Sequence, residues 1–199
     1  MKTATNIQAR INNIPQGQPF TSTELLHCGS RAAIDQALCR LASTHRIVRL
    51  TRGVYVKPEK NAYVGEVLPS PFKIAQVIAN KTGEIIQVSG AEAARIFGLS
   101  TQVPAHPVFL TTGQSRNFML GHLNVTLKHV SKKKIPLYGS KIGLAITALW
   151  YLGKKEVNLH VIKQIQKKLT GQEFITFLSS KAHMPIWMNN VVLQYERTL

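Results

Sequence analysis

The chain has 199 residues and a formal charge of +16 at pH 7, because 25 lysines and arginines outnumber nine aspartates and glutamates. This length allows one domain or two small ones, and the cationic excess indicates a polyanionic partner, for which nucleic acid fits better than a membrane. The first ten residues lack the apolar segment of a signal peptide, and the longest helical apolar stretch, 142–152, is too short to cross a bilayer. We therefore expect a cytoplasmic protein with no membrane partner.

The acidic residues are too few and too scattered to predict a catalytic metal site. Asp35 is the only aspartate, and the eight glutamates lie apart from one another, whereas two-metal nucleases hold their ions with clustered carboxylates. No zinc-ligand spacing, phosphate-binding glycine loop or hydrolase nucleophile turn is present. We predict no metal, no cofactor, no catalytic residue and no enzyme activity. Cys28 and Cys39 are predicted to be free thiols in a reducing compartment.

Two short helices are predicted at the start of the chain. Isoleucines recur at i, i+4 and i+7 within residues 6–14, which indicates an amphipathic helix. Thr21 and Glu24 have the spacing of a capping box, which opens a second helix that ends near Gly29.

The stretch from Ser30 to Lys57 predicts a longer helix followed by a hairpin. Ser30 can cap this helix, whose apolar side chains recur at helical spacing on one face. Residues 47–50 alternate like a strand, and residues 54–56 form a second strand after a tight turn at Gly53, which supplies a positive φ. Two helices in tandem and then a basic hairpin predict a winged helix-turn-helix.

The opposite face of the longer helix is small and polar with cationic edges, so it permits close approach to the groove of a duplex. Cations on the hairpin are expected to contact the backbone or the minor groove. A helix plus a hairpin is also common in α+β domains that do not bind DNA, but the net charge favours DNA. We place the DNA-binding domain at residues 1–65. The residues predicted to contact DNA are Ser30, Arg31, Gln36 and Arg40 on the helix, and Arg49, Arg52 and Lys57 on the hairpin.

Residues 66–199 are predicted to form a second domain, after a loop-rich passage over residues 58–71. The pattern is mixed α/β, with C-terminal helices and a small antiparallel sheet, for which residues 108–129 are a candidate three-stranded meander. The predicted fold class is α+β, a winged helix-turn-helix followed by this mixed domain. The expected elements are helix 72–81, strand 84–88, helix 90–97, strands 108–112, 117–120 and 123–129, and helices 141–152, 158–169, 171–180 and 184–197.

Three polar segments of the second domain are candidate interaction sites. One is the loop between the helix at 90–97 and the next strand, one is a turn that could hold a phosphate, and one is a run of lysines that could add a second phosphate contact. A structural loop, a solvated turn and a solvated surface are the alternatives. The residues concerned are Ser100, Thr101 and Gln102 in the loop, Arg116 in the turn, and Lys132, Lys133 and Lys134 in the run.

Four stretches of the sequence carry a resemblance to a known family. They are SRAAIDQALCRL from Ser30, RGVYV at Arg52–Val56, SGAEAARIFGLSTQVP at Ser89–Pro104, and VFLTTGQSRNFMLG from Val108. Together they resemble the AbiEi-type antitoxins of bacterial type IV toxin–antitoxin and abortive-infection (phage-defence) systems over nearly the whole chain. RGVYV alone is common to many wings, whereas the long run from Ser89 makes the resemblance specific.

This resemblance implies a transcription regulator whose N-terminal winged helix represses its own operon by binding repeats in double-stranded promoter DNA. It also implies a C-terminal domain that counters a nucleotidyltransferase-type toxin encoded next door, by acting on the toxin's effect or state and not through a tight permanent complex. The alternative is a protein-interaction module that neutralises the toxin by direct binding, with DNA binding secondary. A nucleic-acid enzyme is the third hypothesis, which the scarcity of clustered acids disfavours.

Overall fold

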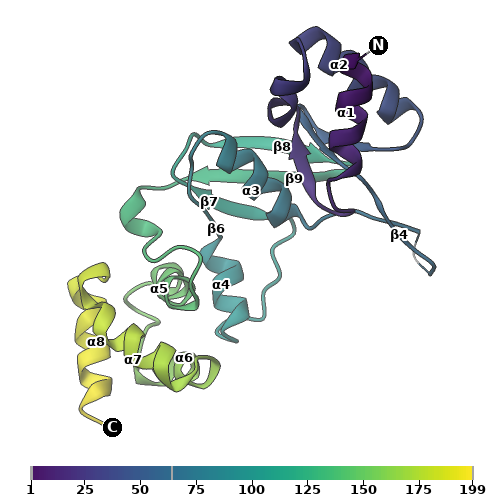
Figure 1. The fold of residues 1–199 in the computed structure, drawn as a ribbon. Helices are drawn as coiled ribbons and strands as arrows, with labels where there is room; N and C mark the ends of the chain where they lie inside the picture. The colour runs from purple at the N-terminus through teal and green to yellow at the C-terminus, as the bar shows by residue number, and fades with distance from the viewer. Residues whose placement is uncertain (1, 64, 199) are drawn as a thin grey trace. The chain divides into compact units, whose positions relative to one another are not determined.

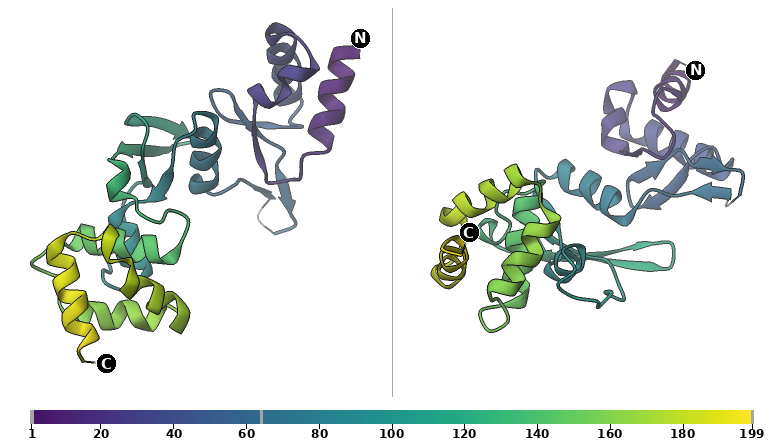
Figure 2. Two further views of the ribbon diagram at one scale, coloured as in Figure 1. Left: turned by 60° about the vertical axis from the view of Figure 1, so that its left-hand side comes forward. Right: turned by 90° about the horizontal axis from the view of Figure 1, so that it is seen from below.

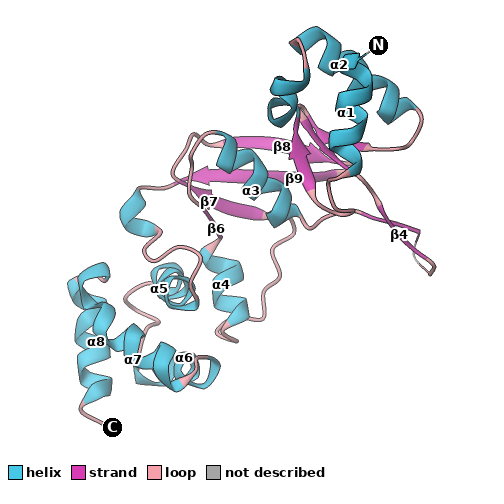
Figure 3. Ribbon diagram, viewed as in Figure 1, coloured by secondary structure: helices cyan, strands magenta, loops and turns pink. Residues whose placement is uncertain are grey.

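The computed structural model describes residues 2–63 and 65–198, and the chain divides into two compact units. The protein is α+β with small antiparallel and mixed sheets, which confirms the predicted fold class at that level (Figure 3). The first unit is Met1–Gly83 with Asn117–Val125, and the second unit is Glu84–Arg116 with Thr126–Leu199.

A three-stranded sheet of order β1-β3-β2 forms the centre of the first unit (Figure 1). Residues of β3 alternate between its two faces, so Tyr55 packs with helices α1 and α2 while Val54 and Val56 pack with α3. Tyr55 stacks on Phe20 of β1, with 6.1 Å between the ring centroids. The elements of this unit are α1 (Lys2–Asn12), β1 (Pro19–Thr21), the 3-10 helix η1 (Ser22–Cys28), α2 (Arg31–Ser43), β2 (Val48–Thr51), β3 (Val54–Val56), β4 (Glu59–Asn61), β5 (Gly65–Val67) and α3 (Pro71–Lys81).

The caps predicted for the helices of the first unit are present. The Ser30 hydroxyl accepts the backbone N–H of Ala33 at 3.4 Å, which starts α2. The Glu24 carboxylate accepts the backbone N–H of Thr21 at 2.8 Å, so the predicted second helix also forms, as the 3-10 helix η1.

Strands β1, β4 and β5 were not predicted. Strand β1 pairs with β3, and β4 pairs with β5 inside the passage 58–71 that we expected to be a loop. Each has only three residues, and the described side chains of β4 and β5 are exposed. Segments of three residues are too short to show the apolar alternation that identifies a strand.

Helix α3 belongs to the first unit, so the division differs from the predicted boundary between residues 65 and 66. Ile74 of α3 is fully buried and packs with Leu50 and Val56 of the central sheet. Phe118 and Leu120, from a hairpin much later in the chain, pack against the same cluster. The sequence marks the loop before α3, but only long-range packing decides which core the helix joins.

The second unit combines a four-stranded sheet of order β6-β7-β9-β8 with a group of helices. Residues 117–125 of strands β8 and β9 lie in the first unit, and the rest of the sheet lies in the second. The elements after α3 are β6 (Ile86–Val88), α4 (Gly90–Ile96), β7 (Val108–Thr111), β8 (Arg116–Leu120), β9 (Leu123–His129), the 3-10 helix η2 (Lys132–Lys134), α5 (Lys141–Leu152), α6 (Leu159–Lys168), α7 (Gly171–Ser179), the 3-10 helix η3 (Ser180–His183) and α8 (Ile186–Glu196).

The predicted three-stranded meander over residues 108–129 is wrong. Strand β7 pairs with β9 in parallel, from Val108 opposite Thr126 to Thr111 opposite His129, and with β6 in antiparallel. Both edges of β7 are therefore occupied, and β8 lies beyond β9. Alternation identifies each strand but carries no information on its neighbour, and β9 lies beside β7 where β8 was expected.

The helices from Lys141 onward form one cluster, drawn green to yellow in Figure 2. Asn158 and Thr170 cap α6 and α7. Trp187 of α8 is partly buried against the apolar core of this cluster. Within residues 2–63 and 65–198, no helix has both the length and the apolar character needed to cross a membrane.

Candidate nucleic-acid interface

Helix α2 presents a polar surface because its apolar side is fixed in the core. Ile34 and Leu38, four residues apart, are fully buried. Arg31, Gln36 and Arg40 are all exposed, as the helical spacing predicted. Ser30 is also exposed, but its hydroxyl is engaged in capping the helix.

One acid lies among these cations. Arg31 donates from its Nε to Asp35 at 3.0 Å, and both side chains are about half exposed, at 52% and 53%. An exposed pair of this kind is worth only about 0.3–0.5 kcal/mol, so a phosphate can replace Asp35 as the partner of Arg31. Arg40 makes no ion pair with any described residue.

The hairpin of β2 and β3 is tied to the start of η1. Gly53 has φ +76°, the left-handed conformation that the sequence predicted for the turn. Its carbonyl accepts the backbone N–H of Ser22 at 3.1 Å, and Val54 pairs with Thr21 of β1. Arg52, at the tip, is exposed on a turn whose backbone is anchored on the η1 side.

The two other hairpin cations differ from each other. Arg49 is exposed on β2 and makes no ion pair with a described residue. Lys57 is half-buried, and its Nζ donates to the carbonyl oxygen of Asn12, the last residue of α1, at 2.9 Å. A cation at a helix C-terminus is stabilising, so Lys57 has a structural partner that sequence spacing could not reveal.

A groove of about 400 Å³ between α1 and α2 extends the exposed surface of α2. Gln36 and Arg40 of α2 face Gln8 and Ala4 of α1 across it. Gln8 is not among the residues that the sequence predicts to contact DNA. The signal was its position next to buried Ile7, on the polar side of an amphipathic helix.

Two of the three loop candidates of the second unit are exposed. Thr101 and Gln102 are exposed, and Ser100 is half-buried. The Ser100 hydroxyl accepts the backbone N–H of Gln102 at 3.2 Å, so it shapes the loop by a local turn. Thr101 and Gln102 are therefore the polar side chains that this loop offers to a partner.

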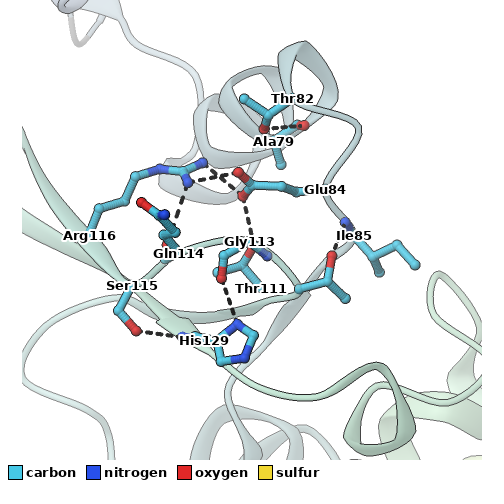
Figure 4. A network of polar contacts seen from close by, with 11 residues as sticks. Ala79, Thr82, Glu84, Ile85, Thr111, Gly113, Gln114, Ser115, Arg116 and His129 are labelled. Carbon is cyan, nitrogen blue, oxygen red and sulfur yellow. Dashed lines mark hydrogen bonds and ion pairs between the residues drawn. The ribbon is translucent and has the colours of Figure 1, made fainter.

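Arg116 is the centre of a polar network (Figure 4). Its two terminal nitrogens donate to the two carboxylate oxygens of Glu84, each at 2.8 Å. The Thr111 hydroxyl donates to the same carboxylate at 2.9 Å. A phosphate would have to displace this bidentate pair, so the geometry disfavours the predicted phosphate contact of Arg116 and favours a structural role.

Gly113 completes this network, because it lies very close to the carboxyl group of Glu84. A Cβ at this position would overlap the carboxyl group of Glu84. Its N–H donates to the Thr111 hydroxyl at 3.0 Å, and its carbonyl oxygen lies 2.7 Å from Nδ1 of His129. The glycine in the TTGQSR run is therefore needed for packing, and the turn fixes β7, β8 and β9 together.

Lys132, Lys133 and Lys134 form the short helix η2, and all three side chains are exposed. The Nζ of Lys134 lies over the ring of Trp150, 5.8 Å from its centroid, which is a cation–π contact. Lys134 therefore has an aromatic partner within the second unit.

Acidic groups elsewhere in the second unit are used for local structure. The Arg95 side chain hydrogen-bonds to Glu92, which lowers the pKa of Glu92 and raises that of Arg95. The backbone N–H of Thr170 lowers the pKa of Glu173. Among the described residues, no group of three or more His, Cys, Asp or Glu side chains could hold a metal ion.

These features define a strongly basic α+β protein of two units with an exposed cationic helix and hairpin in the first. Residues 6–176 match a family described as a family of unknown function, DUF6088. The chain belongs to this family, and the match includes residues of both units. Comparison with curated proteins gives no match.

Proposed function

We propose that this protein binds a specific duplex DNA sequence through a winged helix-turn-helix in its first unit and represses transcription of its own operon. In this proposal α2 is the recognition helix, η1 precedes it in the motif and the β2–β3 hairpin is the wing. The observation that carries the proposal is the set of exposed cations on α2 and the hairpin that no described acid neutralises: Arg40, Arg49 and Arg52.

The geometry supports different roles for the side chains. Gln36 lies in the middle of the exposed surface of α2, where an amide can read base edges in the major groove. Arg49 and Arg52 can contact phosphates, and Arg31 can do so by leaving Asp35. We assign Lys57 to the scaffold, because its Nζ already binds the carbonyl of Asn12.

The experiment is a gel shift of the full chain on its own upstream promoter DNA, against a scrambled duplex of equal length, across a salt series. Four phosphate contacts predict that log K falls against log salt with a slope of roughly −4. Preferential, salt-sensitive binding to the promoter supports the proposal. A slope near zero, or equal affinity for both duplexes, contradicts it.

Two hairpin variants provide a matched pair. Arg52→Ala should weaken binding to both duplexes by a similar factor and make the salt slope shallower by about 1, because it removes a phosphate contact. Lys57→Ala should leave the slope unchanged. Gln36→Ala should mainly lower the preference for the promoter. Equal losses on both duplexes with Gln36→Ala would show that its assigned role is wrong.

The antitoxin role is the second part of the proposal, and it rests on the resemblance to AbiEi-type antitoxins. Co-expression with a nucleotidyltransferase-type toxin from the neighbouring gene should restore growth if the role is correct. Direct neutralisation is the alternative, favoured by the exposed side chains of Thr101 and Gln102. A stable stoichiometric complex that Gln102→Ala weakens would support direct binding, whereas rescue of growth without a complex would support action on the toxin's effect.

A further inference from the structure

The second unit contains a pocket of about 690 Å³ beside β7, the end of β9 and helix α5. Its walls include the apolar side chains of Val108 and Leu110 from β7 and Val130 after β9. The residues that line it all belong to the second unit. This volume lies within the range of small-molecule sites, and its position is independent of the proposed duplex-binding surface.

Two aromatic side chains at the end of α5 line the pocket. Trp150 and Tyr151 are 36% and 48% exposed, although the preceding residue, Leu149, is fully buried. The rings of Trp150 and Trp187 meet edge to face at an interplanar angle of 89°, with 6.2 Å between centroids, so the partly buried Trp187 supports the orientation of Trp150. Exposed aromatic rings with a fixed orientation are suitable platforms for stacking a flat ring.

The polar groups of the pocket are cationic. Lys128 and Lys134 line it, and among the described residues neither forms an ion pair. The lining includes no carboxylate. The pocket therefore attracts anions, and Lys134, which lies over the Trp150 ring, would gain a stronger partner in a phosphate.

His129 adds a polar group of defined tautomer to the lining. Its Nδ1 lies 2.7 Å from the carbonyl oxygen of Gly113. A carbonyl only accepts hydrogen bonds, so Nδ1 carries the proton, and Nε2 of the neutral ring is an acceptor. Such an acceptor suits the amino group of a base or a sugar hydroxyl.

We propose that this pocket binds a nucleotide unit. The base stacks on Trp150, and the phosphate binds Lys128 and Lys134. The ligand is a free nucleotide or one nucleotide of a single strand, because a base within a duplex is already stacked and cannot reach the aromatic wall. The proposal adds a second nucleic-acid site to the protein, separate from the duplex site of the first unit.

The test measures binding to the full chain by calorimetry with ATP, GTP, CTP and UTP, and by fluorescence anisotropy with fluorescein-labelled single-stranded DNA and RNA oligonucleotides. Saturable binding of a nucleotide assigns the site to free nucleotides, and binding of oligonucleotides alone assigns it to single strands. Either result supports the proposal. Absence of saturable binding of every probe at 1 mM overturns it.

Four variants locate the site. Trp150→Ala should lower the affinity for the probe that binds by about 5- to 150-fold, the range found for removing one stacking ring. Lys134→Ala should also weaken it and make the salt dependence shallower. Tyr63→Ala and Lys155→Ala remove an exposed aromatic ring and an exposed lysine outside the pocket, and should leave affinity unchanged. Unchanged affinity in Trp150→Ala would overturn the proposal.

Two further measurements separate binding from folding and from the duplex site. Trp150→Leu keeps an apolar side chain against Trp187, so it should fold normally by circular dichroism and still lose stacking. Promoter-duplex affinity should be unchanged in Trp150→Leu, and oligonucleotide affinity should be unchanged in Arg52→Ala. Loss of both affinities in either variant would contradict the separation of the two sites.

Discussion

The two units have a similar excess of cations but use their acids differently. The first unit has eleven lysines and arginines and four acids, and the second has fourteen and five. Among the described residues, one acid of the first unit forms an ion pair, whereas four acids of the second do: Asp35 in the first, and Glu84, Glu92, Glu173 and Glu196 in the second.

The second unit uses its acids to fix cations of the scaffold, although cations without an ion pair to a described acid, such as Lys128 and Lys134, remain there too. In the second unit, Glu84 fixes Arg116 between strands that are far apart in sequence. In the first unit, Arg49 and Arg52 are exposed on the β2–β3 hairpin, and neither forms an ion pair with a described acid. Net charge is therefore a poor guide to where a polyanion binds, because it does not distinguish paired from unpaired cations.

The largest effect is expected from breaking the least exposed ion pair. The side chains of Arg116 and Glu84 are 31% and 11% exposed. Glu84→Gln would leave the Arg116 guanidinium without its counter-charge and should lower the free energy of unfolding by about 2–3 kcal/mol. Both tryptophans lie in the second unit, so urea unfolding followed by tryptophan fluorescence reports on that unit.

The control for this variant is Glu92→Gln. The pair of Glu92 and Arg95 is more exposed and lies within one helix, so its loss should cost about 0.5 kcal/mol or less. Equal losses for Glu84→Gln and Glu92→Gln would contradict the structural role of the Arg116 network.

A similar loss is expected from Gly113→Ala, since the added Cβ would displace the Glu84 carboxylate. The free energy of unfolding should fall by about 2–3 kcal/mol in the wild-type background. In a Glu84→Ala background the space is free, so the same substitution should cost little. A double-mutant cycle measures this coupling, and additive losses would show that Gly113 acts through a different contact.

Asp35→Asn should increase the number of unpaired cations in the first unit. Among the described residues Asp35 is the only acid that pairs with a cation on α2, and its replacement leaves Arg31 available to a phosphate. We expect promoter affinity to rise about 2- to 5-fold, while the free energy of unfolding changes by less than about 0.5 kcal/mol. Gel shifts and urea unfolding check the two values. Glu66→Gln, an exposed acid on β5, is the control and should not change affinity.

The smallest effect concerns pH. The backbone N–H of Thr170 lowers the pKa of Glu173 in the folded protein, with Lys141 also contributing. The resulting stabilisation is present above the ordinary pKa of a glutamate and is lost as the pH falls through the lower, folded-state pKa. Glu173→Gln should therefore lower the Tm slightly at pH 7 and not at pH 2.5. A Tm difference that is independent of pH would show that Glu173 acts without its charge.

Local sequence signals predicted most helices and single strands. Helix α5 spans Lys141–Leu152, the predicted range, because Ser140 caps it and Gly153 follows it. The pairing of β7 with β9 could not be predicted in the same way. It depends on which strands meet after the chain folds, and periodicity within one strand does not specify that.

The residues of the candidate site show the same distinction between what local sequence signals predict and what depends on long-range contacts. Exposure of Arg31, Gln36 and Arg40 followed from helical spacing, because Ile34 and Leu38 fix the orientation of α2. The partners of other predicted residues did not follow from spacing. Arg116 meets Glu84 across 32 positions, and Lys57 meets Asn12 across 45. The sequence also does not reveal the pocket lined by Trp150 and Tyr151, because both residues lie in a segment whose pattern predicts an apolar helix.

The assignment of residues 117–125 to the first unit has a consequence for how the protein matures during synthesis. When Gly83 has been synthesised, nearly all of the first unit is present. Phe118 and Leu120, which pack near Ile74, have not yet been synthesised. At typical elongation rates of about 5–20 residues per second, these residues are synthesised roughly 2 to 7 s later. The nascent N-terminal segment must therefore wait, with part of its apolar cluster uncovered, until the β8–β9 hairpin arrives. Neither unit can be exchanged between relatives by a single cut in the gene.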